Sequence, residues 1–214
     1  MTMLRSDLPV LPPNMRDLPI SSRGYPVPFF VPTIDGSHDF RVADRQKLRR
    51  CMTEKLCWIC GKPLGRRLIA FTIGPMCAVN RISSEPPQHP ECAEFAARAC
   101  PFLIVPAMKR RSTTMTHKAP AAGIMIERNP GVALIWMTRR WRVVHEHNGV
   151  LFQIGAPIKT LWFAEGRAAT RSEALEALDS GLPILLKYAQ QDGPEYRAEL
   201  EDNYHRTMRL LPQD

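Results

Sequence analysis

The sequence lacks a long hydrophobic run. Its longest nearly apolar stretch, Pro101 to Met108, covers eight residues, whereas a helix that spans a membrane needs about 20. The N-terminus also lacks the apolar stretch of a signal peptide, because Arg5, Asp7 and several prolines interrupt it. We therefore expect a cytoplasmic protein with no membrane partner. In that compartment cysteines bind metals more often than they form disulfides.

Acidic residues are scarce relative to basic ones. The 214 residues include 29 Lys and Arg against 21 Asp and Glu, a net charge of +8. The excess is uneven, since residues 51–120 contain 10 basic and 4 acidic side chains and residues 171–214 contain 5 and 9. Hydrophobic residues make up 44% of the chain, which excludes wholesale disorder and allows one or two domains.

Proline is concentrated at the start of the chain. Seven of the twenty prolines precede Thr33, and proline removes a backbone donor and favours extended neighbours. Residues 1–50 are therefore predicted to form a proline-rich extended arm that is not a packed element, with Tyr25, Phe29 and Phe30 docking its end on the body. A zinc-binding module at 51–108, a basic linker at 109–122 and an α+β domain at 123–214 are expected to follow.

The C-terminal part has the pattern of strands followed by helices. Four segments have strand composition: 131–138, 141–147, 150–154 and 158–163. Asn148-Gly149 is a strong hairpin signal between the middle two, because both turn positions need positive φ. Thr170 and Glu173 have capping-box spacing, and Pro194 suits the first position of a last helix. The prediction is an α+β fold, with a small antiparallel sheet packed with C-terminal helices.

The cysteines provide the most specific motif. Cys57-Trp58-Ile59-Cys60-Gly61 has the form of a zinc knuckle, in which a tight turn directs two thiolates at one metal ion. Gly61 permits the left-handed backbone that such a turn requires. Further along, Pro90 suits the first turn of a helix, which places His89 at the helix entrance and Cys92 in its opening turn.

A hairpin formed by 66–73 and 76–82 across Gly74-Pro75 is expected between the two pairs. A knuckle, a hairpin and a helix that supplies the remaining ligands resemble a treble-clef zinc finger. The run from Cys57 to Leu103 also looks like uncharacterised proteins of bacterial and phage genomes, which implies a phage or prophage origin but no activity.

The predicted ligands of one Zn²⁺ ion are Cys57, Cys60, His89 and Cys92. Cys77 is the first alternative on spacing and Cys100 the second, although both, like Cys51, are also typical of small buried side chains. Four ligands would close the coordination sphere, whereas catalytic zinc keeps one position open. We therefore favour a non-enzymatic protein.

A second histidine motif is His145-Glu146-His147. Alternation puts its two histidines on one strand face, where they could chelate a metal. Its position beside the Asn148-Gly149 turn favours a polar hairpin end instead.

Basic side chains are the other functional signal. They occur as Arg49-Arg50, Arg66-Arg67, Lys109-Arg110-Arg111 and Arg139-Arg140-Trp141-Arg142. Phosphate backbones, of DNA or RNA, are the commonest partner of such clusters, which are also compatible with a merely solvated surface. Trp141 could stack on a base, but the tryptophans and phenylalanines of this part are more typical of a sheet core.

The sequence therefore predicts a zinc-binding, nucleic-acid-binding or nucleic-acid-associated protein. The alternative is a protein–protein adaptor or inhibitor that grips a protein partner with the module and the arm. A metal-dependent nuclease or hydrolase is the third hypothesis. It is disfavoured because the module contains only His89, whereas a treble-clef nuclease of the HNH kind would have histidines on the hairpin and farther along the helix.

Overall fold

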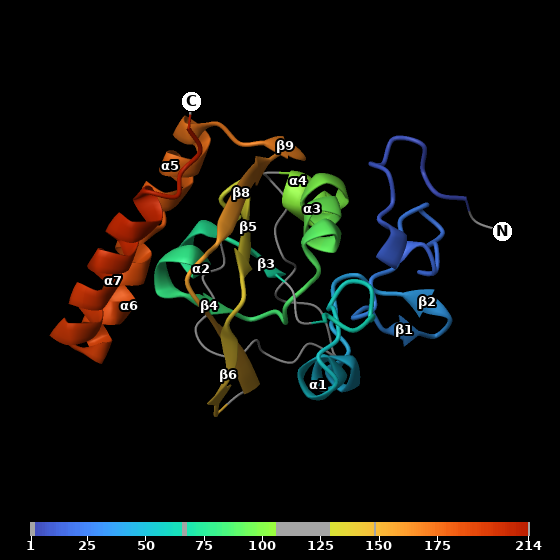
Figure 1. Cartoon of the computed structure of the whole chain (residues 1–214), viewed down its shortest axis with the longest axis horizontal. Helices are drawn as coiled ribbons and strands as arrows, with labels where there is room; N and C mark the ends of the chain where they lie inside the picture. The colour runs from blue at the N-terminus through green and yellow to red at the C-terminus, as the bar shows by residue number, and fades with distance from the viewer. Residues whose placement is uncertain (1–2, 66–67, 106–128, 148, 214) are drawn as a thin grey trace.

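Among the described residues, a four-stranded and a three-stranded antiparallel sheet organise the fold, beside a two-stranded one near the N-terminus, and helices cover both faces of the four-stranded sheet (Figure 1). The computed structural model describes residues 3–65, 68–105, 129–147 and 149–213. The predicted α+β class, with antiparallel sheets and C-terminal helices, is confirmed. Within the described residues, every helix is too short or too polar to cross a bilayer.

The larger sheet has four strands in the order β3-β5-β8-β9. Their bounds are Ile69–Ile73, Val132–Thr138, Lys159–Ala164 and Arg167–Ala168. All seven residues of β5 are buried, as expected of a central strand covered on both faces. The register sets Trp136 opposite Phe71 on one side and Thr160 on the other.

Helices of different origin cover the two faces of this sheet. Helix α3 (Pro90–Ala99), followed by α4 (Pro101–Ile104), lies on one face, where Ala93 packs with Ile135 and Phe163. The opposite face presents Leu134 and Trp136 to the other helices. These are α2 (Pro75–Asn80), α5 (Arg171–Asp179), α6 (Leu182–Asp192) and α7 (Pro194–Met208). In Figure 1 the green α3 and the orange and red α5 to α7 therefore lie on opposite sides.

The smaller sheet has the order β4-β7-β6. The bounds of these strands are Ile82–Ser83, Gly149–Ile154 and Trp141–Glu146. The predicted hairpin between β6 and β7 is confirmed, and its register sets Val144 opposite Leu151. The Trp136 indole donates to the Gly155 carbonyl over 2.8 Å and so ties the two sheets together.

The C-terminal helices begin where the sequence predicts. Thr170 and Glu173 form both bonds of a capping box at the start of α5. Pro194 is the first residue of α7. The aromatic residues of this part form core, since Trp136, Phe152, Trp162 and Phe163 are all buried.

The hairpin predicted over 66–82 is wrong. Strand β3 pairs instead with β5, across the segment 109–122, and forms a single bridge from Ala70 to Gln88. Residues 75–80 form helix α2, because Pro75 occupies a first helical position rather than a turn. Arg81 ends the helix with a left-handed backbone (φ 61°). The division into four segments stays a prediction, but segments 51–108 and 123–214 share a sheet.

The first fifty residues contain little regular structure but are packed. Their elements are the 3-10 turn Pro13–Met15, β1 (Thr33–Ile34), β2 (Ser37–His38) and α1 (Arg45–Thr53), which continues past residue 50. Met15 is only 1% exposed and belongs to the main core, so the prediction of an unpacked arm is wrong here. The docking of the arm's end is confirmed, because Phe30 stacks on Trp58 with ring centroids 4.8 Å apart.

Candidate metal centre

The knuckle is a tight turn that directs two sulfurs to one point. The Gly61 amide donates to the Cys57 carbonyl and the Cys57 amide to the Lys62 carbonyl, each over 2.8 Å. Gly61 has a φ of +71°, and a Cβ there would lie 2.6 Å from the Phe29 ring. Glycine is therefore needed both for its backbone conformation and for the close approach of the arm.

Helix α3 supplies the other two side chains. His89 is its N-cap residue, and Pro90 occupies the first helical position. Cys92 lies in the first turn, where the positive end of the helix dipole favours a thiolate. Because α3 packs on the larger sheet, His89 and Cys92 are fixed to that sheet, whereas Cys57 and Cys60 belong to the segment that follows α1.

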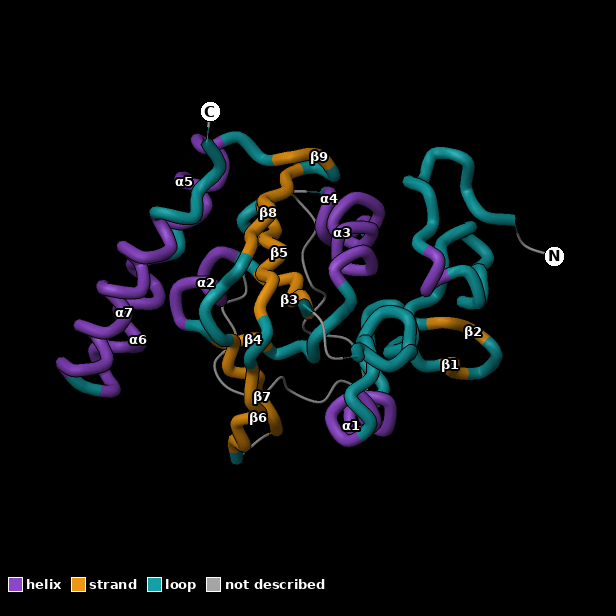
Figure 2. Tube along the Cα trace, in the orientation of Figure 1, coloured by secondary structure: helices purple, strands orange, loops and turns teal. Residues whose placement is uncertain are grey.

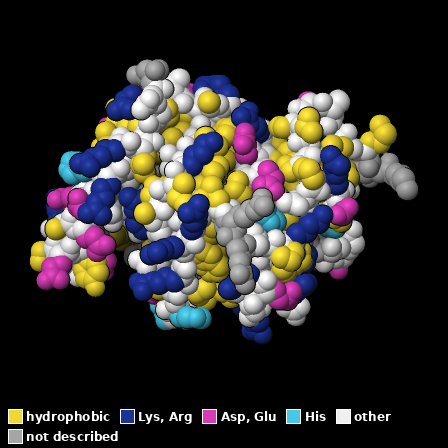
Figure 3. All heavy atoms as spheres, viewed as in Figure 1, with side chains coloured by type: hydrophobic (Ala, Val, Ile, Leu, Met, Phe, Trp, Pro, Cys, Tyr) yellow, Lys and Arg dark blue, Asp and Glu magenta, His cyan; other side chains and the backbone are white. Residues whose placement is uncertain are grey.

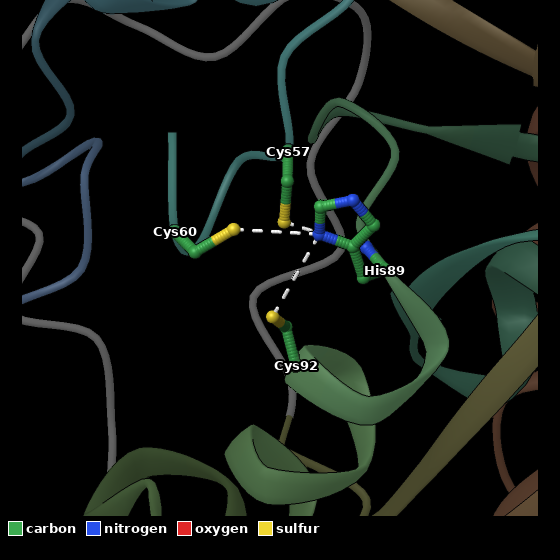
Figure 4. A group of neighbouring side chains, drawn as sticks. All are labelled: Cys57, Cys60, His89 and Cys92. Atoms are coloured by element: carbon green, nitrogen blue, oxygen red, sulfur yellow. Dashed lines mark hydrogen bonds between the residues drawn. The ribbon is translucent and has the colours of Figure 1, made fainter. Parts of the chain in front are cut away.

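The four side chains converge as Figure 4 shows. Their ligand atoms all lie within 4.8 Å of one another. The His89 Nδ1 atom is 3.3 Å from Cys60 Sγ and 3.9 Å from Cys92 Sγ. Zinc bonds of about 2.3 Å to sulfur and 2.0–2.1 Å to nitrogen give a tetrahedron with edges of about 3.5–3.8 Å. The donor set and its spacing therefore fit a metal ion, and three sulfurs with one imidazole are typical of zinc.

Backbone groups orient two of the four donors, His89 and Cys57. The His89 Nε2–H group donates to the Pro63 carbonyl over 3.0 Å, which leaves Nδ1 to face the sulfurs. The His89 amide donates to Cys57 Sγ over 3.3 Å. Both contacts join the knuckle to the start of α3, so the cluster is oriented before any ion is considered.

The electrostatics of the cluster favour a thiolate at Cys57 and disfavour one at Cys92. Burial raises the pKa of Cys57, but hydrogen bonds from Cys60, Cys92 and His89 outweigh it and hold that pKa below its usual value. Hydrogen bonds to Cys57 and Cys60, together with burial, raise the pKa of Cys92. Hydrogen bonds to the same two sulfurs raise the pKa of His89 to about 10. A divalent cation is the natural counter-charge for thiols packed this closely.

The three sulfurs of the cluster are shielded from solvent, whereas His89 is half-buried. Cys57 and Cys92 are fully buried and Cys60 is 7% exposed. Four protein donors fill a tetrahedral sphere, which is the pattern of structural rather than catalytic zinc sites. The arrangement can therefore hold a metal and join two segments, but it offers no open coordination position.

Among the described residues, the other cysteines and histidines lie outside this group. Cys51 is buried beside Leu56 and Trp58, and burial raises its pKa to about 12. Cys77 on α2 and Cys100 at the end of α3 are not among the four clustered side chains, so neither alternative ligand is supported. His145 is exposed on β6, and His147 is exposed beyond its end.

The predicted basic residues separate into two groups. Arg66, Arg67, Lys109, Arg110 and Arg111 lie outside the described residues. Arg139, Arg140 and Arg142 are exposed around the turn from β5 to β6. The fold adds Lys159, which is exposed at the start of β8 opposite Met137. These four residues are called the basic cluster below; Figure 3 shows Lys and Arg side chains gathered over the region of β4 and β6.

Sequence reasoning missed the long-range contacts of the site. The Pro63 carbonyl and Lys159 gain their roles only through folding, and no local pattern marks them. Trp141 packs at 5.8 Å from the Phe152 ring, so its indole is occupied by the core rather than presented for stacking on a base.

Comparison with protein-family models, with curated proteins and with solved structures finds no match. The treble-clef resemblance is thus reduced to what the chain itself shows, a Cys₃His cluster built from a knuckle and a helix start.

Proposed function

We propose that this chain is a non-enzymatic protein that binds one structural Zn²⁺ ion and engages nucleic acid through the basic cluster. Zinc held by Cys57, Cys60, His89 and Cys92 would supply Lewis-acid bonds that fix the knuckle to α3. The nucleic-acid part rests on one observation, the gathering of unpaired cations at one end of both sheets.

Basic side chains without an acidic partner lie close together at this end of the molecule, whereas others, such as Arg16, Arg49 and Lys187, are spread along the described chain. Elsewhere in the described chain many arginines have acidic partners, as Arg98 has in Glu94 and Arg197 in Glu201. Within the described residues, none of the four members of the basic cluster has an acidic partner within 4.0 Å. Cations without an acidic partner are available to phosphate oxygens, with which arginine forms paired hydrogen bonds; Arg142 also donates to the Gln153 side chain.

Phosphate backbones fit this arrangement better than a single small anion. The four cations come from a turn and two strand starts, so they are spread along one edge and do not surround a point. Contacts of this kind position a nucleic acid without reading its sequence. Release of counterions would then make binding strongly dependent on salt.

The test is a titration of labelled duplex DNA and single-stranded RNA at several salt concentrations. A cluster that makes about four phosphate contacts should give a log–log salt slope near −3 to −4 on duplex DNA. The double variant R139A/R140A should reduce that slope by about one unit per lost contact, on any sequence.

The matched control is R197A/R206A, which removes the same charge from arginines that pair with Glu201 and Asp202 on α7. Its slope should equal that of the unmodified protein. The nucleic-acid proposal fails if neither probe binds at low salt, or if both double variants lose affinity equally.

A protein adaptor is the second candidate, supported by a shallow groove between the arm and α3. Pro9, Val10 and Pro12 line one side and Phe95 with Arg98 the other. Val10 is 92% exposed and so offers an apolar contact to a partner at the edge of this groove. If protein binding is the function, Val10→Asp should abolish capture of a host protein while leaving the salt slope on DNA unchanged.

A further inference from the structure

Strand β6 is an edge strand in which a cation and an anion lie on either side of an apolar residue. It pairs with β7 on one side, and among the described strands nothing pairs with its other side. The β6–β7 hairpin projects from the lower edge of the molecule in Figure 2. Edge strands in natural proteins are commonly shielded by proline, charged side chains or a bulge. The sequence Trp-Arg-Val-Val-His-Glu has no proline, its pairing with β7 is continuous, and its two charges lie on either side of an apolar centre.

Alternation fixes which backbone groups of β6 face outward. The Gly155 amide donates to the Arg140 carbonyl over 2.8 Å, so residue 140 directs its backbone groups toward the β7 side. The backbone groups of residues 142, 144 and 146 therefore also face β7. In an antiparallel pair successive residues alternate between the two sides. The amides and carbonyls of Trp141, Val143 and His145 are therefore the ones available to another strand.

The side chains on one face of β6 change from basic to apolar to acidic along the strand. Arg142, Val144 and Glu146 lie on the same face because strand side chains repeat every second residue. Arg142 and Glu146 are exposed, and Arg142 donates to the Gln153 side chain on β7. Val144 lies opposite Leu151, and both are half-buried. The row thus runs from a cation through an apolar centre to an anion.

We propose that β6 pairs antiparallel with β6 of a second copy of this chain, centred on Val144. This register sets Arg142 opposite Glu146 of the second copy twice, once on each side of the two-fold axis. Val144 meets its own equivalent at the centre. Val143 faces His145 of the second copy, and both have outward backbone groups, so the ladder bonds can form.

Other self-pairing registers lose these contacts. A pairing centred on Val143 sets Arg142 opposite Val144, and one centred on His145 sets Val144 opposite Glu146. Opposite charges directly across an antiparallel pair stabilise it, whereas a charge facing an apolar side chain does not. When two copies of a strand with a cation near one end and an anion near the other pair antiparallel, each cation lies opposite an anion. This is why we propose a second copy of the chain as the partner of β6.

The test is sedimentation equilibrium over a range of protein concentrations with charge-exchange variants. The unmodified chain should form a dimer as concentration rises. Glu146→Arg should weaken dimerisation at least tenfold, because two Arg–Glu pairs become Arg–Arg pairs. The exchange variant R142E/E146R should restore it, since the register then recreates both pairs with reversed signs.

Amide hydrogen exchange provides the second measurement. The outward amides of Val143 and His145 should gain protection as the dimer forms, whereas the inward amides of Arg142 and Val144 should be protected at every concentration. Thermal unfolding of each variant checks that the monomer is intact. A chain that stays monomeric, a dimer indifferent to Glu146→Arg, or a loss that the exchange variant does not restore would each overturn the proposal.

Discussion

Residues 3–64 and the sheet body (68–105 with 129–213) are held together by different means. The sheet body has continuous ladders and a core in which Leu134, Ile135 and Trp136 are completely buried. Residues 3–64 have one helix, two short strands and a small cluster around Cys51 and Trp58. Two of the four clustered side chains come from each region.

This difference indicates what a metal bound at the cluster would do, which is to hold the two regions together. A segment with few regular hydrogen bonds and a thin core gains little stability from packing alone. A bound metal that requires donors from both regions makes their association part of the binding free energy. The contacts at Met15 and between Phe30 and Trp58 position the segment that a bound metal would fix.

The largest expected effect comes from removing one donor. Cys60→Ser should abolish stoichiometric zinc binding, because a three-donor site cannot close the tetrahedron. Limited proteolysis should then cleave residues 3–64 while the sheet body persists as a resistant fragment. Cys51→Ser is the control, since Cys51 is buried outside the cluster, and it should retain its zinc. Equal protease resistance of both variants would show that packing alone holds the first region.

The converse change weakens the sheet body. Leu134→Ala at the fully buried centre of β5 should lower the free energy of unfolding by about 2–5 kcal/mol. Below its melting temperature the variant should still bind one zinc, because the four donors keep their positions. Chemical denaturation followed by metal analysis checks both. Loss of zinc from the folded variant would show that zinc binding depends on the packing of the sheet body.

A smaller effect tests the contact between arm and knuckle. Gly61→Ala combines a left-handed φ of +71° with a Cβ that would meet the Phe29 ring at 2.6 Å. Gly36→Ala is the matched control, with a φ of +76° and nothing within 4 Å. Backbone strain should cost each variant about 1–2 kcal/mol. Thermal unfolding should show a larger loss for Gly61→Ala, and identical losses would mean that the Phe29 contact is absent in solution.

The smallest effect concerns the cap of α5 in the sheet body. A hydrogen bond from Arg167, aided by the Thr170 backbone amide, lowers the pKa of Glu173 to about 2. Since the pKa is lowered on folding, the stabilisation is present above the unfolded value and is lost as the pH falls through about 2. Glu173→Gln should therefore be less stable than the unmodified chain at pH 7. Denaturation curves at decreasing pH should converge, and a pH-independent difference would exclude the charge as its cause.

The features predicted from sequence are those encoded locally. The hairpin around Asn148-Gly149, the capping box at Thr170 and the helix start at Pro194 each depend on neighbouring residues. The four clustered donors belong to the same class, because a knuckle and a helix start are both short patterns.

The features that were missed depend on distant residues or on ambiguous ones. Gly74-Pro75 is compatible with a turn or with a helix start, and only the pairing of β3 with β5 decides between them. Met15 is buried by the rest of the chain despite its proline-rich surroundings. Lys159 joins the basic cluster through strand pairing, which no local signal specifies.

X-ray absorption at the zinc edge, combined with metal quantification of protein purified without chelators, tests the central claim most directly. One zinc per chain is expected, with three sulfur neighbours at about 2.3 Å and one nitrogen at about 2.0–2.1 Å. His89→Ala should remove the nitrogen from that shell. Protein without zinc, or a shell of four sulfurs that His89→Ala leaves unchanged, would contradict the assignment of Cys57, Cys60, His89 and Cys92.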